Sequence, residues 1–271
     1  MRISLFSQSL FALPLREAIG TTADIGFHAI ELACREPHLG YEIALRNSEG
    51  IAEQIRQAGL AVSALSLFSN LTEQAGLRNQ VKMAGKFIAL APLFDTKLIK
   101  MTPGPPASLD AEEKHWQCLA DSVNELVPMA RDAGVKLAFE THMRQLTDTL
   151  SSTERFLEMT PSDCVGLTVD FSNLSFAGEK MPQVVALLKD RMYHTHIKNG
   201  YIDSEGGWDF RSLDTGLTDY SMVLPLLMDT GYNGYLSIEC VGQEAKTDPA
   251  QTAQRDLAIL DRYLEEAGCK I

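Results

Sequence analysis

The chain has 271 residues, of which 45% are hydrophobic, and a formal net charge of −12 at neutral pH. This length suits a single large α/β barrel, and the hydrophobic content is ordinary for a globular protein. The acidic balance, without any stripe of Lys and Arg, excludes a nucleic-acid-binding surface. No apolar run is long enough to predict a membrane-spanning helix.

The cysteines and the N-terminus favour a cytoplasmic protein. The five cysteines are scattered along the chain and lack a C-x-x-C spacing, so reduced thiols are the simplest interpretation. Residues 1–15 weakly resemble a signal peptide, but Ser and Gln interrupt the apolar stretch and no A-x-A cleavage site follows. Residues 2–7 are better interpreted as a first strand.

Strand-like and helix-like segments alternate from one end of the chain to the other. The expected strands are 2–7, 27–33, 60–69, 96–102, 135–141, 165–171, 192–198 and 234–240. The expected helices lie near 14–25, 47–58, 77–93, 110–133, 151–159, 181–190, 219–230 and 249–267. Eight such units without a Pro- or Ser-rich linker predict one (β/α)8 TIM barrel that spans residues 1–271 as a single domain. A doubly wound sheet is the alternative, but the even repetition favours a closed barrel.

One connection, residues 199–219, has little periodicity and contains Gly206, Gly207 and Trp208. Long structureless loops in compact domains are usually functional or disordered. We therefore expect this loop to cover a substrate at the C-terminal mouth of the barrel. Arg211 would reach the substrate if the loop closes, whereas Trp208 suits loop packing equally well.

Four strand-like runs in the second half carry a metal-competent side chain near their C-terminal ends. These side chains are Glu140, Asp170, His196 and Glu239. Because strand side chains alternate between faces, all four belong to the inward face, while large apolar residues occupy the other face. Three carboxylates gathered without a cation would raise one another's pKa, and a divalent ion removes that conflict. Taken one at a time, each carboxylate could instead cap the following helix or pair with a neighbouring cation.

The donor set of three oxygens and one nitrogen indicates which metal to expect. It suits Mn, Mg or Co better than a structural zinc site, with Zn as the alternative, and it leaves coordination positions open for a substrate.

Other polar residues lie near the predicted ligands. His194 is one layer deeper than His196 and suits a core histidine or a partner of the ligands. Lys198 lies on the same strand face as His196, closer to the C-terminal end of the barrel. It is either a solvated lysine at the strand end or a contact to a substrate oxygen. His142, one step above the first ligand, either touches substrate or caps a helix. Glu31 ends the second strand on the opposite wall and is a weaker candidate for substrate binding.

Several motifs carry a family resemblance: Phe139-Glu-Thr-His142, Val169-Asp170-Phe-Ser-Asn173, His194-Thr-His-Ile-Lys198 and Gly231-Tyr-Asn-Gly-Tyr-Leu-Ser-Ile-Glu239. With them the chain resembles the sugar phosphate isomerase/epimerase superfamily of xylose isomerase-like TIM barrels. The resemblance implies that Glu140, Asp170, His196 and Glu239 bind one divalent ion, and that the two glutamates act as acid and base.

The chain departs from the ketose 3-epimerases of this superfamily at two positions. A histidine commonly stands three residues after their ligand aspartate, where this chain has Asn173. They also use a glutamate about six residues after the first ligand, where this chain has Leu146.

The expected activity is isomerisation or epimerisation of a small sugar, keto-sugar or polyol. Glu140 and Glu239 would move a proton while the ion stabilises an enediolate. The alternative is a lyase or dehydratase that eliminates water from a related keto-sugar or keto-polyol after the same proton abstraction. An abasic-site endonuclease would need more histidines and conflicts with the acidic charge, and a non-catalytic carbohydrate-binding barrel leaves the ligand set unexplained.

The expected partner is a small carbohydrate, without nucleic acid or membrane. The absence of a glycine-rich phosphate loop after the last two strands favours an unphosphorylated substrate. The sequence leaves the oligomeric state open, with a homo-oligomer as one option.

Overall fold

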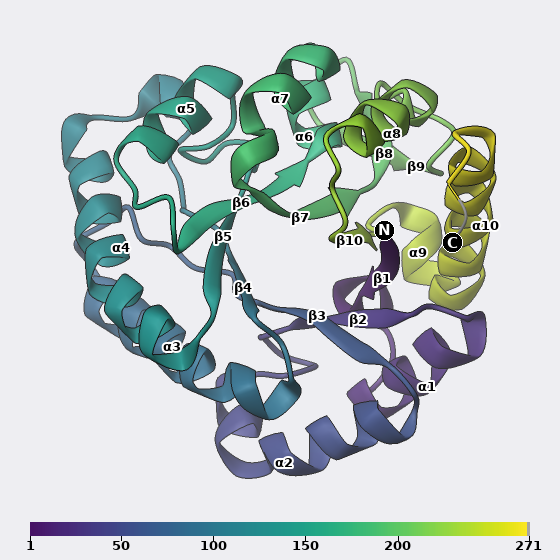
Figure 1. Cartoon of the computed structure of the whole chain (residues 1–271), viewed down its shortest axis with the longest axis horizontal. Coiled ribbons are helices and arrows are strands. Elements are labelled where there is room, and N and C mark those ends of the chain that lie inside the picture. Colours follow the sequence, from purple (N-terminus) through teal and green to yellow (C-terminus); the bar gives the residue numbers. More distant parts are fainter. Residues whose placement is uncertain (270–271) are drawn as a thin grey trace.

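Eight parallel strands close into a barrel at the centre of the computed structural model, which describes residues 1–269 (Figure 1). The barrel strands are β1 (Arg2–Phe6), β2 (Ala29–Ala33), β3 (Ala61–Ser66), β4 (Leu98–Met101), β5 (Lys136–Glu140), β6 (Val165–Asp170), β7 (Met192–Ile197) and β10 (Tyr235–Ile238). They neighbour one another in chain order, and β10 pairs with β1 to close the ring. The predicted (β/α)8 fold is confirmed.

Helices surround the barrel on all sides (Figure 1). The helices that connect successive barrel strands or end the chain are α1 (Leu15–Ile25), α2 (Tyr41–Gln57), α3 (Leu77–Leu90), α4 (Glu113–Ala133), α5 (Leu150–Glu158), α7 (Met181–Leu188), α8 (Tyr220–Asp229) and α10 (Pro249–Glu266). Short 3-10 turns add η1 (Ser7–Leu10), η2 (Ala91–Phe94), η3 (Ser108–Asp110) and η4 (Lys189–Arg191). Within residues 1–269, no helix has the length and apolar character needed to cross a membrane.

The predicted alternation of faces along the strands is visible in β5. The Phe139 ring packs against Phe156 of α5, with ring centroids 4.9 Å apart, and both side chains are fully buried. Burying a phenylalanine contributes roughly 1.5–3 kcal/mol, so this outward face anchors the helix layer to the barrel. The next residue, Glu140, therefore points into the barrel.

The structure differs from the sequence expectations in the connections. Residues 199–219 are not structureless, because β8 (Asn199–Ile202) and β9 (Trp208–Arg211) pair as an antiparallel hairpin. Each strand has only four residues and most of them are solvent-accessible, so no apolar alternation marks them. Helix α2 begins at Tyr41 instead of residue 47, with a kink at Asn47.

Two short helices, α6 (Phe171–Phe176) and α9 (Gln243–Thr247), were not expected and follow β6 and β10 at the C-terminal end of the barrel. The expected strand 165–171 thus ends one residue earlier, at Asp170, which caps α6.

Gly166 in β6 allows the neighbouring strand to approach closely. A Cβ atom at this position would lie 2.5 Å from the carbonyl oxygen of Arg191 and 2.5 Å from the Tyr193 ring. The contact to Arg191 is with backbone, so a side chain at position 166 would push β6 and β7 apart.

We predict that Gly166→Ala lowers the free energy of unfolding by about 1–3 kcal/mol, the usual result of overpacking a core. Urea denaturation measures the change. Gly20→Ala is the matched control, because Gly20 lies inside α1 with no atom within 4 Å of an added Cβ. It should stabilise the protein by about 0.5–1 kcal/mol. Equal effects of the two substitutions would contradict this account of the β6–β7 contact.

Candidate metal centre

Four side chains from neighbouring barrel strands meet inside the barrel near its C-terminal end. Glu140 ends β5, Asp170 ends β6, His196 lies in β7 and Glu239 directly follows β10. One nitrogen or oxygen atom from each lies within 4.8 Å of those of the others, and all four residues are buried. The structure therefore brings the whole predicted ligand set together.

Asp170 uses its two carboxylate oxygens differently. Oδ1 accepts a hydrogen bond from the backbone N–H of Asn173 at 2.9 Å and so caps α6. Oδ2 is buried and pairs with the Lys198 ammonium, whose Nζ lies 2.8 Å away. The capping turn thus fixes the carboxylate with one oxygen directed to the cluster, which makes helix capping and ion binding compatible.

His196 presents one ring nitrogen to the carboxylates. Its Nδ1 lies 3.3 Å from Glu140 Oε1, 3.7 Å from Glu239 Oε2 and 4.0 Å from Asp170 Oδ2. Burial alone would lower the pKa of His196, but the carboxylates of Glu31 and Glu140 outweigh it and raise this pKa to about 10. The environment of Nδ1 therefore strongly favours a positive charge at this position.

Two buried lysines share the cluster with the carboxylates. Lys198 Nζ lies 2.8 Å from Asp170 Oδ2 and 2.7 Å from Glu239 Oε2. Lys100 Nζ lies 2.5 Å from Glu140 Oε2, and both partners of this pair are 2% exposed. Burial would raise the pKa of Glu140, yet the Lys100 ammonium outweighs it and holds this pKa well below its usual range. The Lys100 ammonium therefore keeps the Glu140 carboxylate ionised inside the barrel.

Lys100 was not among the site residues predicted from the sequence. A signal for it existed, because Lys100 is the one charged residue inside the apolar run Leu98-Ile-Lys-Met101. A lysine in a buried barrel strand needs a carboxylate partner, and an inward glutamate on the neighbouring strand supplies one.

The charges of the cluster fit a divalent cation. The four buried carboxylates are those of Glu31, Glu140, Asp170 and Glu239, and the two buried lysines are Lys100 and Lys198. With neutral histidines these groups leave two negative charges, which one divalent ion would neutralise. Three carboxylates and one imidazole are also donors that divalent metals accept, so the residues fit the predicted ion.

The β8–β9 hairpin contacts the C-terminal end of the barrel, where the cluster lies. The ring of Phe210 in β9 lies 5.6 Å from Lys198 Nζ. Gly206 lies at the tip of the hairpin, and its carbonyl accepts a hydrogen bond at 3.1 Å from Arg144 of the β5–α5 connection. The Arg144 guanidinium also lies 4.5 Å from the centre of the Trp208 ring, so Trp208 takes part in this packing.

The predicted substrate-binding residues occupy different surroundings. Lys198 lies within the cluster, and His142 is half-buried just above Glu140, with Nδ1 2.8 Å from the Met143 carbonyl. Arg211 is exposed in β9 and pairs with Asp209 at 2.6 Å, so it is not brought to the cluster.

Glu31 lies beneath the candidate ligands and is fully buried. It contacts the Nε2 atoms of both His194 and His196.

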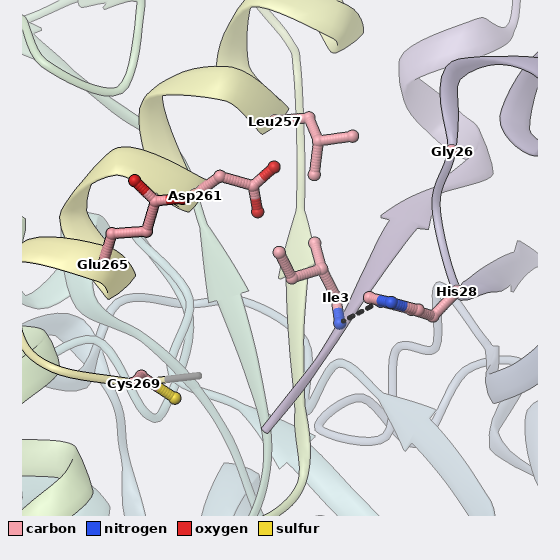
Figure 2. A pocket seen from close by; sticks show the side chains of 7 residues that line it. All are labelled: Ile3, Gly26, His28, Leu257, Asp261, Glu265 and Cys269. Carbon is pink, nitrogen blue, oxygen red and sulfur yellow. Dashed lines mark hydrogen bonds between the residues drawn. The ribbon is translucent and has the colours of Figure 1, made fainter. Parts of the chain in front are cut away.

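A pocket of about 580 Å³ opens at the opposite, N-terminal end of the barrel (Figure 2). It is lined by Ile3, His28, Asp261, Glu265 and Cys269 among others, and Nδ1 of His28 accepts a hydrogen bond from the Ile3 amide at 3.4 Å. In the part of the chain that the structure describes, the only groups able to hold a metal ion contain His196, so none lies in this pocket.

Comparison with known proteins identifies a family and several relatives. A model of the xylose isomerase-like TIM barrel family matches residues 19–263. An inosose dehydratase of Clostridium perfringens is 25% identical over 190 residues, which cover 65% of this chain and 59% of that protein. The chain thus spans about three fifths of the length of this curated relative.

Solved structures share the barrel almost from end to end. The IolI protein with a bound zinc atom superimposes with a TM-score of 0.85 at 17% identity, covering 98% of this chain and 99% of that one. A probable 3-DHS dehydratase, AsbF of Bacillus anthracis, gives 0.81 at 18% identity with 96% and 99% coverage. An L-ribulose 3-epimerase gives 0.80 at 23% identity with 98% and 95% coverage. At these identities the likeness shows the fold alone.

We predict that Lys198→Met destabilises the metal-free protein by about 3–5 kcal/mol, because Asp170 and Glu239 lose a buried ammonium partner. Urea denaturation in the presence of a chelator measures this loss. Saturating Mn²⁺ should restore most of it, since the ion takes over the neutralisation.

The control for this experiment is Lys114→Met, which removes a solvent-exposed lysine paired with Glu112 and should change stability little. If Mn²⁺ stabilises neither the parent nor Lys198→Met, the four side chains are not a metal site.

We predict that Arg144→Ala loosens the β8–β9 hairpin, because it removes the hydrogen bond to Gly206 and the contact with Trp208. Limited chymotrypsin digestion should cut residues 199–211 faster in the variant than in the parent. Bound substrate should slow the cleavage in both proteins. Arg46→Ala, which removes an exposed pair with Glu42 in α2, should leave the rate unchanged. Identical cleavage with and without substrate would show that the hairpin does not cover the site.

Proposed function

The chain belongs to the xylose isomerase-like TIM barrel family, and on this premise we propose that it is a divalent-metal-dependent dehydratase of a small keto-polyol or keto-sugar. From the sequence, isomerisation or epimerisation was the expected activity and dehydration was the alternative. The relatives support dehydration better, because the matching curated relatives include inosose dehydratases. A probable 3-DHS dehydratase and an L-ribulose 3-epimerase share the fold, so the fold alone is compatible with both chemistries.

The surroundings of Asn173 and Leu146 are the observation that carries the choice. These residues stand where ketose 3-epimerases have a histidine and a glutamate. Asn173 is 1% exposed and its Nδ2 donates to the Thr141 carbonyl at 2.9 Å, while Leu146 is fully buried in the core. The histidine and the glutamate of the 3-epimerase pattern are therefore both missing from this chain, and Leu146 offers no polar group in place of the glutamate.

The ligand set supports a proposal for the ion and its role. An ion held by Glu140, Asp170, His196 and Glu239 would polarise the ketone oxygen and acidify the neighbouring C–H group. Mn, Mg and Co suit the oxygen-rich donor set, and the zinc atom of the IolI protein supports Zn as the alternative.

Two glutamates and a lysine would carry out the elimination. Glu140, which Lys100 keeps ionised, would take the proton from the carbon next to the ketone. The C–H electron pair would first delocalise onto the ketone oxygen, and this step is reversible. It would then form a carbon–carbon double bond as the C–O bond of the hydroxyl on the next carbon breaks. Glu239, in protonated form, would give its proton to that hydroxyl, which leaves as water. Lys198, 2.7 Å from Glu239, is positioned to donate a hydrogen bond to the departing oxygen.

The proposed substrate is small and unphosphorylated, and it would be enclosed by the β8–β9 hairpin. The aromatic ring of Phe210 next to Lys198 supports such an enclosure. His142, above Glu140, would contact the substrate without taking part in proton transfer.

We predict that the Mn²⁺-loaded protein in heavy water converts inosose or 3-DHS to a product lighter by one water. Recovered substrate should carry solvent deuterium on the carbon next to the ketone, because proton removal precedes elimination. Glu140→Gln and Glu239→Gln should each lower both signals by at least about 100-fold, as expected for the loss of a general acid or base. His142→Ala should mainly raise KM. Mass spectrometry measures both the exchange and the product.

Two results would contradict this proposal. A product isobaric with the substrate, apart from the label, would establish an isomerase or epimerase. Cleavage of abasic DNA above background, without exchange on any keto-polyol, would favour the endonuclease.

A further inference from the structure

We propose that Glu31 positions His196 for metal binding by fixing which ring nitrogen faces the ion. The inference rests on the metal site of the proposed function, and it assigns a role to a residue that the sequence analysis considered for substrate binding. Glu31 lies in β2 and His196 in β7, on strands that are not adjacent in the barrel. Their contact therefore crosses the barrel interior.

Glu31 has no acceptor capacity left for a substrate. It is fully buried and accepts hydrogen bonds from His194 Nε2 at 2.8 Å, His196 Nε2 at 2.9 Å and Ser237 Oγ at 2.6 Å. The Ser66 hydroxyl donates to Oε1, the oxygen that also accepts from His196, whereas His194 and Ser237 donate to Oε2. A carboxylate offers about four acceptor positions, and these donors use all of them.

The direction of these hydrogen bonds determines which ring nitrogen of His196 carries a hydrogen. An ionised carboxylate only accepts hydrogen bonds, so Nε2 of His196 must carry a hydrogen. An imidazole that keeps this hydrogen can bind a metal only through Nδ1. Nδ1 is also the atom that faces the cluster, 3.3 Å from Glu140 Oε1 and 3.7 Å from Glu239 Oε2. Glu31 thus selects the nitrogen that the geometry requires, in the way that outer carboxylates orient metal-binding histidines.

The ring of His196 is held from another side as well. The Phe6 ring stacks on it, with centroids 5.2 Å apart and planes at 28°. Rotation of the imidazole would break this stacking and the bond to Glu31 together. Glu31, Ser66, His196 and Ser237 come from β2, β3, β7 and β10, so the orientation is fixed by four strands of the barrel.

Glu31, His194 and His196 are also close enough to form a three-ligand metal site of their own. The two serine hydroxyls argue against that use, because they already occupy the Glu31 oxygens. An ion bound by these three residues would also have to displace the hydrogens on Nε2 of His194 and His196. A hydrogen-bonded support for His196 accounts for all these contacts.

The test is the affinity of Glu31→Gln for Zn²⁺ and Mn²⁺, measured by competition with a chromophoric chelator. The amide keeps the shape of the side chain but replaces one acceptor oxygen with a donor, so the affinity should fall roughly 10–100-fold. Ser237→Ala should cause a smaller fall, because it removes one support of Glu31. The control is Asp256→Asn, which alters a buried carboxylate outside the cluster and should leave the affinity within about twofold.

A second readout separates positioning from a general effect on stability. In the zinc-loaded parent protein with ¹⁵N-labelled histidine, NMR should show a hydrogen on Nε2 of His196 and none on Nδ1. Zinc bound to Nε2, or a folded Glu31→Gln with parental affinity, would overturn the proposal. If Glu31→Gln does not fold, the metal affinity of Ser237→Ala and the NMR spectrum of the zinc-loaded parent protein test the proposal in its place. These measurements use no substrate, so a parent protein that binds zinc but dehydrates nothing would contradict the dehydratase proposal alone.

Discussion

The burial of four carboxylates inside one barrel is the constraint on which the rest of the site depends. Removing an ionised group from water costs several kcal/mol unless a cation compensates for it. Lys100 and Lys198 supply part of the compensation, and each contacts candidate ligands directly. The remaining negative charge explains why His196 is drawn towards its protonated form without a metal, and why a divalent cation suits the centre of the cluster.

Local sequence patterns were sufficient to predict the barrel and the gathering of the candidate ligands inside it. Period-two alternation assigns Glu140, Asp170 and His196 to one face, and closure in chain order brings those faces together. The role of Glu31 could not be predicted in this way, because its partners lie up to 206 residues away and meet only after the barrel closes. The hairpin was missed for another reason: its strands are short and accessible, so neither length nor apolar alternation distinguishes them from a loop.

Dehydration and epimerisation begin with the same proton removal, so a ligand set alone cannot separate them. They differ in the step that follows: epimerisation returns a proton to the same carbon, whereas dehydration expels the hydroxyl from the adjacent carbon. The residues around the ligands therefore carry more information about the activity than the ligands do. In this chain, an asparagine takes the place of the epimerase histidine at position 173, and its Nδ2 is bonded to the Thr141 carbonyl. Lys198 lies beside Glu239, an arrangement suited to an oxygen leaving group.

Asp170 links a helix to the candidate metal site. Its Oδ1 closes the first turn of α6, and its Oδ2 faces the other ligands. Any change that favours the capped turn also favours the Asp170 rotamer whose Oδ2 faces the candidate ligands. If the proposed ion binds there, substitutions in α6 that contact no candidate ligand would still alter the affinity for it. By reciprocity, binding would tighten the turn. Hydrogen exchange at the Asn173 amide would then report occupancy of the site from the helix.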